Sequence, residues 1–171
     1  MSGAKKFLGL WIMIAMYGVV LPWTFFLLFS WLDLVLGLSP ILAHGIGVIL
    51  AAAAFLVGFF WIFWSYSYLH FIGKGTPVEA FGVALHPTEK LVTTGPYAYT
   101  RNPMMFGALI FLLAIALYYR SLSGIIIIPI ILIIESIYIV MFEEPQLRKR
   151  FGKDYQDYRK SVPSLFPKFK A

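Results

Sequence analysis

Two polar stretches could carry chemistry in this apolar chain. The first, residues 95–103, leads directly into an apolar segment, and the second, the pair Glu143-Glu144, closes the next apolar segment. Asn102-Pro103 is a helix-start signal, with Asn as N-cap and Pro at the first helical position. A helix that begins there points free backbone N–H groups and the positive end of its dipole at the preceding loop, where a carboxylate or phosphate could bind.

The two glutamates predict a positive charge close by. Pro145 is expected to end the preceding helix, so both carboxylates would lie at a helix C-terminus, where the dipole disfavours negative charge. Arg101, Arg150 or a bound cationic ligand could offset that cost. The alternative is that the pair lies at the membrane interface and pairs with a basic C-terminal helix, while Arg101 anchors a lipid phosphate.

Other groups have weaker claims to a chemical role. Glu135 lies inside an apolar segment, where ionisable groups are costly; it could line the same cavity as the glutamate pair, but a protonated acid hydrogen-bonded within the helix bundle is the favoured interpretation. His70 and His86, sixteen residues apart, make only a weak metal site, so no bound metal is expected. Tyr97 and Tyr99 could stack on a purine or anchor the chain at the membrane interface.

Composition places the chain in the membrane class. Its 171 residues are 60% hydrophobic and only 13% charged, against about a quarter charged in ordinary soluble domains. The absence of cysteine excludes disulfides, thiolate catalysis and Cys-ligated metals. The net charge of +6 indicates anionic lipid headgroups as partners rather than nucleic acid, because the chain is so apolar.

Four apolar segments are long enough to cross a bilayer, whose hydrocarbon core takes about 20 residues of helix. The sequence therefore predicts an all-α integral membrane protein with a single membrane domain, residues 1–171. The predicted spans are 7–32, 41–64, 104–119 and 122–142, and the predicted cytosolic segments are 73–103 and 143–167. The short link between the last two spans makes them an antiparallel hairpin.

A basic amphipathic helix is expected after Pro145, because apolar residues recur there at helical spacing with basic residues between them. The apolar residues are Leu147, Phe151, Tyr155, Tyr158 and Val162. With four spans, all lysines and arginines except Arg120 fall on one side of the membrane. The positive-inside rule then places both termini and the long loop in the cytoplasm.

Several motifs together resemble the isoprenylcysteine carboxyl methyltransferase family, whose superfamily also contains integral-membrane phospholipid N-methyltransferases. They are residues 90–97 (KLVTTGPY), 101–104 (RNPM), 143–147 (EEPQL) and 151–155 (FGKDY). Each motif alone is weak, but their order and spacing are specific. The resemblance covers residues 73–167, which is more than half of the chain.

The resemblance implies a multi-span helical fold with S-adenosylmethionine as methyl donor, bound at the cytosolic face. Carried over residue by residue, the implied cofactor-binding residues are Leu91, Val92, Gly95, Pro96, Tyr97, Tyr99, Arg101, Asn102, Pro103, Glu143 and Glu144, and the implied catalytic residues are Arg101, Glu143 and Glu144. Two positions depart from the family pattern. The usual His is Asn102, which cannot change charge near neutral pH, and the usual Tyr is Met105.

A methyl donor of this kind would use both charges of the site. It carries a sulfonium, an ammonium and a carboxylate, so we expect Glu143 or Glu144 to meet the cationic groups, and the hairpin N-terminus with Arg101 to meet the carboxylate. An in-line displacement at a sulfonium needs no covalent enzyme intermediate, so positioning and water exclusion can supply much of the rate. An amphiphilic acceptor would approach from the bilayer, an isoprenylcysteine-type carboxylate first and a phospholipid amine second.

Two other classes of protein stay open at this point. Membrane sterol reductases have a broadly similar C-terminal region and use NADPH, although this chain is short for them. A small non-enzymatic membrane binding or assembly protein would explain the spans and the basic helix, but not the long Gly/Pro-rich loop and the paired glutamates. The sequence does not determine the oligomeric state, since the small residues of the second span permit close helix packing within or between chains.

Overall fold

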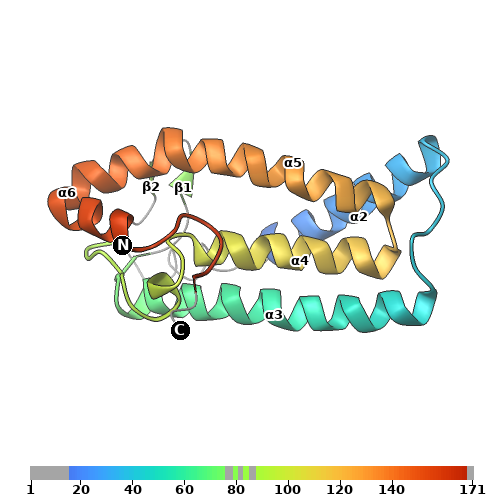
Figure 1. The fold of residues 1–171 in the computed structure, drawn as a ribbon, viewed down its shortest axis with the longest axis horizontal. Helices are drawn as coiled ribbons and strands as arrows, with labels where there is room; N and C mark the ends of the chain where they lie inside the picture. Colours follow the sequence, from blue (N-terminus) through green and yellow to red (C-terminus); the bar gives the residue numbers. More distant parts are fainter. Residues whose placement is uncertain (1–15, 76–78, 81–82, 85–87, 169–171) are drawn as a thin grey trace. The chain divides into compact units, whose positions relative to one another are not determined.

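A computed structural model of the chain describes residues 16–75, 79–80, 83–84 and 88–168, and most of them are helical (Figure 1). The main helices are α2 (Leu21–Val35), α3 (His44–Phe71), α4 (Pro103–Tyr119), α5 (Leu122–Tyr138) and α6 (Glu144–Ser161). Short turns of other helix types are η1 (Met16–Val20), η2 (Gly95–Ala98) and η3 (Ile139–Glu143). Two-residue strands, β1 (Glu79–Ala80) and β2 (Val83–Ala84), pair antiparallel within the long loop.

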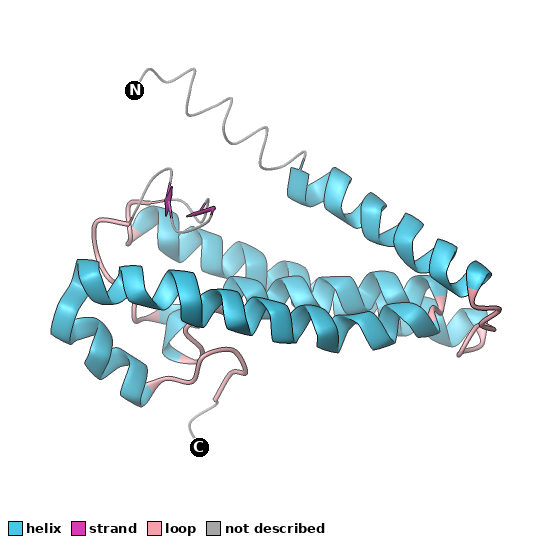
Figure 2. Cartoon of the chain, turned by 90° about the horizontal axis from the view of Figure 1, so that it is seen from above, coloured by secondary structure: helices cyan, strands magenta, loops and turns pink. Residues whose placement is uncertain are grey.

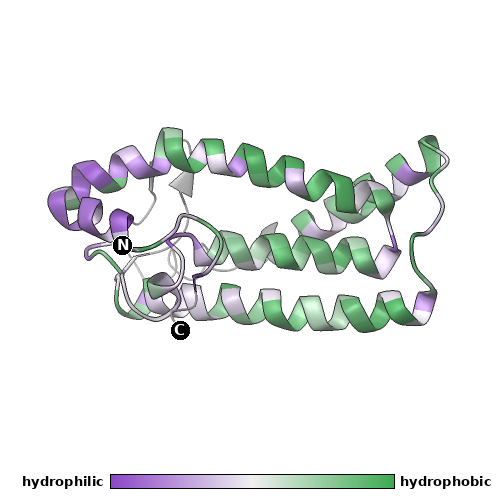
Figure 3. Cartoon of the chain, viewed as in Figure 1, coloured by the Kyte–Doolittle hydropathy of each residue, from purple (hydrophilic) through white to green (hydrophobic). Residues whose placement is uncertain are grey.

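The described part of the chain confirms a helical membrane protein. Three helices in it are long and apolar enough to cross a bilayer, and they lie within Gly18–Val35, His44–Phe71 and Leu122–Ser161. α4 is a shorter apolar helix of 17 residues, at the lower end of what can span. Figure 3 shows α3, α4 and α5 as mainly hydrophobic and α6 as mainly hydrophilic. The start of the first predicted span, residues 7–15, lies outside the described residues.

The polar end predicted for the second span is helical as well. Ser65 and Ser67 donate hydrogen bonds to the carbonyls of Trp61 and Phe63, four residues earlier, at 2.5 and 2.8 Å. These hydroxyls are thus satisfied within the helix, and α3 continues to Phe71. α3 is therefore longer than the predicted span 41–64.

The chain folds into two compact units, and α3, α4 and α5 each contribute to both. The first unit comprises the described parts of Met1–Ala54 and Leu112–Ile128, and the second comprises those of Phe55–Phe111 and Pro129–Ala171. In the first unit the start of α5 is fixed to α2: Ser123 donates its backbone N–H to Asp33 Oδ1 (3.0 Å) and its hydroxyl to the carbonyl of Phe29 (3.2 Å). The predicted site residues all belong to the second unit.

In the second unit, α3 and α4 approach each other through two glycines. A Cβ on Gly58 would lie 2.8 Å from the Gly107 carbonyl oxygen and 2.8 Å from the backbone nitrogen of Phe111. A Cβ on Gly107 would lie 2.9 Å from the Gly58 carbonyl oxygen. Small residues permit this close approach of membrane helices, and the contact fixes the helix that carries the Arg101 loop.

Gly58→Ala is expected to lower the thermal stability of the detergent-purified protein. The new methyl group would meet backbone atoms, which cannot move aside, so overpacking should cost about 1–3 kcal/mol, or several degrees of Tm. Gly45→Ala on the same helix is the control, because no described atom lies within 4 Å of its added Cβ. Equal melting temperatures for the two variants would contradict the close contact.

The helix end predicted at Pro145 is wrong. α5 passes through the π-helical turn η3 directly into α6, and Pro145 lies in the first turn of α6. Proline is tolerated in a first helical turn because its missing N–H has no intrahelical partner there. The helix changes direction further on, at Gly152 (φ 53°), where the left-handed conformation suits glycine; Figure 2 shows the resulting bend in α6.

Candidate functional site

A buried glutamate joined to three arginines is the centre of the second unit. Arg101 Nη1 donates to Glu144 Oε1 at 2.7 Å. Arg148 Nη2 and Arg159 Nε form ion pairs with Glu144 Oε2 at 3.5 and 3.1 Å. Glu144 is only 2% exposed. Arg148 precedes the bend at Gly152 and Arg159 follows it. The cluster therefore joins the loop before α4 to both halves of α6.

The cluster carries an excess of positive charge. Three guanidinium groups surround one carboxylate, and the side chains of Arg148 and Arg159 are 45% and 41% exposed. Arg101 is 9% exposed, and its Nε is buried without a hydrogen-bond partner among the described residues. Because Arg101 is almost enclosed, the two half-exposed arginines form the accessible rim of this cluster, and that rim could bind an anionic group.

The second predicted counter-cation, Arg150, lies elsewhere. Its guanidinium donates to the backbone carbonyl and, at 3.1 Å, to the hydroxyl of Thr88. It therefore fixes the end of the long loop to α6 and does not contact the glutamate pair. Its place is taken by Arg148 and Arg159, which the sequence argument did not single out; Arg148 lies one turn after Glu144, and that spacing is the signal that could have identified it.

Three buried tyrosines lie beside the cluster. Tyr97, Tyr155 and Tyr158 form a buried core with Val92. Tyr158 donates its hydroxyl to the carbonyl of Tyr97 at 2.7 Å, and Arg101 Nη1 donates to the Tyr155 hydroxyl at 3.2 Å. These contacts hold the η2 turn and α6 together around Arg101.

Burial raises the pKa of all three phenols, because a phenolate would lose its hydration. For Tyr97 the pKa is raised further by Tyr158 and by the carboxylate of Glu143. Glu143 is partly exposed. The phenols therefore stay protonated near neutral pH; the Tyr158 hydroxyl donates to the Tyr97 carbonyl, and the Tyr155 hydroxyl accepts from Arg101.

Tyr97 and Tyr158 should fail to ionise in the native protein at about pH 11, above the ordinary tyrosine pKa of 10.0. Because folding raises the pKa of each tyrosine, its contribution to the free energy of unfolding is fully present below pH 10.0. This contribution is lost as the pH rises above that value. An ultraviolet titration should show at least two fewer phenolates, those of Tyr97 and Tyr158, in the native than in the denatured protein. Tyr97→Phe should leave the native titration unchanged; a reduced native amplitude would contradict the burial of that phenol.

A C-terminal segment, residues 163–168, covers the start of α4. Arg101 and Asn102 donate their backbone N–H groups to the carbonyls of Pro163 and Ser164, at 2.9 and 3.1 Å. The hydroxyl of Thr100, which is fully buried, donates to the carbonyls of Ser164 and Leu165. The sequence argument did not foresee this role of the segment, although its prolines are a signal for an extended chain after the last helix.

α4 begins at Pro103 as predicted, but Asn102 does not cap it with its side chain. The Asn102 amide instead donates to the Ser164 carbonyl at 2.9 Å, while its own carbonyl accepts the first helical hydrogen bond from Phe106. The N–H groups of Arg101 and Asn102 are thus already bonded. The C-terminal segment therefore covers these two donors, which precede the helix; that the first turn of α4 itself offers N–H groups to an anion stays a prediction.

The other predicted cofactor-binding residues lie around this core. Gly95 (φ 60°) opens η2, and an added Cβ would overlap the ring of Tyr68. Pro96 and Pro103 are fully buried, and Leu91 is packed against the tyrosine core. Tyr99 lies beside the rings of Trp61 and Trp64, with centroids 6.4 and 6.1 Å away. These residues shape the site through packing.

Glu135 and His70 do not belong to the cluster. Glu135 is partly exposed on α5 and its side chain has no hydrogen bond within the described part of the chain, so the hydrogen bond expected within the bundle has no partner there. His70 stacks on Tyr66, with ring centroids 5.8 Å apart. His86 lies outside the described residues. No group of three potential metal ligands occurs among the residues that are described.

A family model described as phospholipid methyltransferase matches residues 46–154, which is more than half of the chain. The matched part includes Arg101, Glu144 and the first half of α6, and it ends before Arg159 and the C-terminal segment. No curated protein and no solved structure matches the chain.

Proposed function

The chain belongs to the phospholipid methyltransferase family, and from this premise we propose that it transfers a methyl group from S-adenosylmethionine to a lipid-like acceptor. Membership of the family makes it a membrane methyltransferase; the donor and the acceptor are the parts we propose. The observation that carries the proposal is the buried Glu144 with its three arginines. It unites the loop before α4 with both halves of α6, the same segments that the family motifs occupy.

The charges on the chain fit the donor. When bound, S-adenosylmethionine supplies a methyl group on a sulfonium, and it carries an ammonium and a carboxylate elsewhere. The rim formed by Arg148 and Arg159 provides net positive charge for the carboxylate. Glu143 is the partly exposed carboxylate of the pair, and we assign it to a cationic group of the donor. Glu144 and Arg101 are too enclosed for direct contact and act by holding the arginines in place.

The residues of the chain position the reactants and exclude water. Methyl displacement at a sulfonium requires the acceptor atom in line with the breaking bond, so orientation supplies a large part of the rate. The η2 turn is fixed by Tyr158 on the Tyr97 carbonyl, and the start of α4 is fixed by the C-terminal segment. A site built on such fixed elements needs no nucleophilic side chain.

Two classes of methyl acceptor are proposed. The family description reverses the order in which they were expected from the sequence. A phospholipid amine now comes first, because the matching family is described by phospholipid methylation. An isoprenylcysteine-type carboxylate comes second. The distribution of basic residues supports a topology with both termini and the site on the cytoplasmic side.

The test is the thermal stability of the purified protein with S-adenosylhomocysteine, with NADPH as the contrast. A ligand at 100 times its Kd should add about 2.7 kcal/mol of stability. A saturable shift with the homocysteine compound alone, followed by transfer of labelled methyl to a lipid, is the expected result. A shift with NADPH alone would favour the reductase. No shift with either ligand, in detergent and in bilayer nanodiscs, would overturn the proposal.

A further inference from the structure

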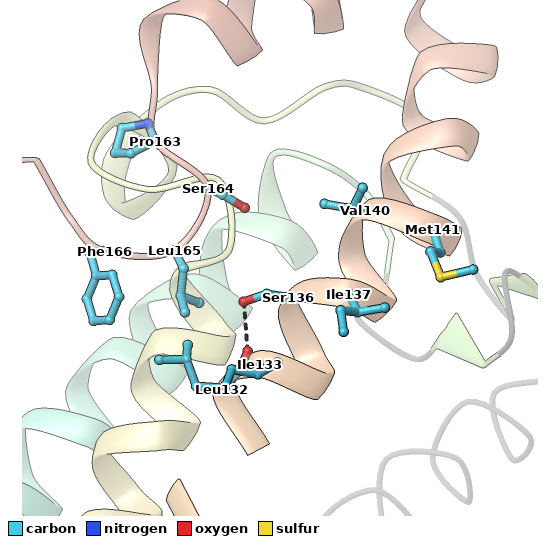
Figure 4. A pocket seen from close by; sticks show the side chains of 10 residues that line it. All are labelled: Leu132, Ile133, Ser136, Ile137, Val140, Met141, Pro163, Ser164, Leu165 and Phe166. Carbon is cyan, nitrogen blue, oxygen red and sulfur yellow. Dashed lines mark hydrogen bonds between the residues drawn. The ribbon is translucent and has the colours of Figure 1, made fainter. Parts of the chain in front are cut away.

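An apolar groove runs along α5 and η3 in the second unit. One wall is the helix face over residues 132–141, and the other is the C-terminal segment over residues 163–166 (Figure 4). The groove has a volume of about 770 Å³, within the usual range for ligand sites. The Ser136 hydroxyl on its helix wall donates to the Leu132 carbonyl at 2.7 Å, so this polar group is satisfied within the helix and the wall is effectively apolar.

We propose that this groove binds one acyl chain of the methyl acceptor. The proposal rests on the proposed function and adds the place on this chain where the acyl chain is held. Its first support is location. The groove lies on the helix Leu122–Ser161, which contains a membrane-spanning window of mean hydropathy 2.8 that is only 6% buried by protein. The groove is therefore open to lipid rather than to water.

The length of the groove fits one leaflet. Its helix wall rises over ten residues, roughly 13 Å at 1.5 Å per residue, and half of a ~30 Å hydrocarbon core is about 15 Å. The wall ends at Met141, two residues before Glu143. A chain bound along it would thus leave its polar headgroup next to the glutamate pair. The end of the helix wall nearest Glu143 lies in the π-helical turn η3. π-Helical turns occur frequently at functional sites.

The second wall is built and not incidental. Its residues Pro163 and Ser164 accept the backbone N–H groups of Arg101 and Asn102, and Leu165 is buried. Figure 4 shows Ser164 and Leu165 facing Ser136 and the neighbouring residues of the helix wall across the groove. The hydrogen bonds that hold this wall also hold the backbone of Arg101. They therefore connect one wall of the groove directly to the candidate site.

A matched pair of variants tests the groove. Ile133 and Ile134 are adjacent and both are 59% exposed, but only Ile133 lines the groove. Ile133→Trp should raise the KM for a long-chain phosphatidylethanolamine about tenfold or more, because displacing only two methylenes from an apolar wall has that effect. It should leave turnover of a short-chain, soluble analogue and the binding of S-adenosylhomocysteine unchanged. Ile134→Trp should behave as the wild type.

A photolabelling experiment tests whether a lipid chain occupies the groove, independently of catalysis. Phosphatidylethanolamine with a diazirine on one acyl chain should label residues 132–141 and 163–166, in competition with unlabelled long-chain lipid, and Ile133→Trp should lose the label. Uniform labelling that extends to Ile126 and Ile130, without competition, would overturn the groove and indicate ordinary lipid contact. Equal kinetics for the two tryptophan variants would overturn it as well. Specific labelling without any methyl transfer would support the lipid-chain site and overturn the proposed function alone.

Discussion

Replacing Glu144 with Gln is expected to destabilise the protein by about 3 kcal/mol, since breaking a buried ion pair leaves an uncompensated charge. Both Glu144 and Arg101 are at least nine-tenths buried, so solvent screens this pair little. The Gln amide would also direct N–H donors at guanidinium groups that have only donors. We expect Tm to fall by roughly 5–10 °C and methyl transfer to fall at least about 100-fold, because the loop before α4 and α6 lose their common anchor.

Glu89→Gln is the control, because it makes the same chemical change in an exposed ion pair. It lies 3.9 Å from Lys74, and both side chains are more than half exposed, so its loss should leave Tm almost unchanged. The double variant Glu144→Gln with Arg101→Gln should recover part of the lost stability, since removing both partners leaves no unpaired buried charge. A single Glu144→Gln variant as stable as Glu89→Gln would refute the buried cluster.

Glu143→Gln should have a different pattern: a smaller fall in Tm than Glu144→Gln and a large loss of donor binding. Glu143 is partly exposed, in contrast to its neighbour. We expect the affinity for S-adenosylhomocysteine, which keeps the ammonium but lacks the sulfonium, to fall about 10-fold, and the affinity for S-adenosylmethionine about 10- to 100-fold, because a charge-assisted contact is lost. Calorimetric titration of both compounds measures the two losses separately.

The adjacent variants Glu143→Gln and Glu144→Gln form their own comparison, since the chemical change is identical. Glu144→Gln should act first on folding, and Glu143→Gln mainly on binding. If Glu143→Gln binds both compounds with wild-type affinity and melts as the wild type does, Glu143 does not meet the donor, and its assignment must be abandoned. A loss of stability equal to that of Glu144→Gln would show that Glu143 belongs to the buried core instead.

The sequence alone predicted the helices because an apolar run of this length has one common solution in a bilayer. A helix satisfies its own backbone groups where no water can. The predicted spans 104–119 and 122–142 accordingly match α4 (Pro103–Tyr119) and the run from α5 through η3, Leu122–Glu143, to within one residue at each end. The charge argument likewise brought Arg101 and the glutamate pair into one site, because two carboxylates at the end of an apolar span require a cation.

Predictions from neighbouring residues failed where the chain had another helix geometry or another hydrogen-bond partner available. Pro145 was expected to end a helix, but the π-helical turn before it lets the chain continue into α6. Asn102 was expected to cap α4, but its amide found the Ser164 carbonyl, 62 residues away along the chain. Both corrections depend on partners that a reading of neighbouring residues does not contain.

The sequence by itself determined the membrane class, the helices, the family motifs and the segments that form the site. Only the tertiary structure decided which of two chemically identical neighbours is enclosed. The bend at Gly152 and the C-terminal segment bring Arg159 and Arg101 to Glu144, while Glu143 stays partly exposed. Helix formation is a local response to the solvent, so composition can predict it; burial of one particular carboxylate depends on distant cations arriving together, and that is a property of the packed chain.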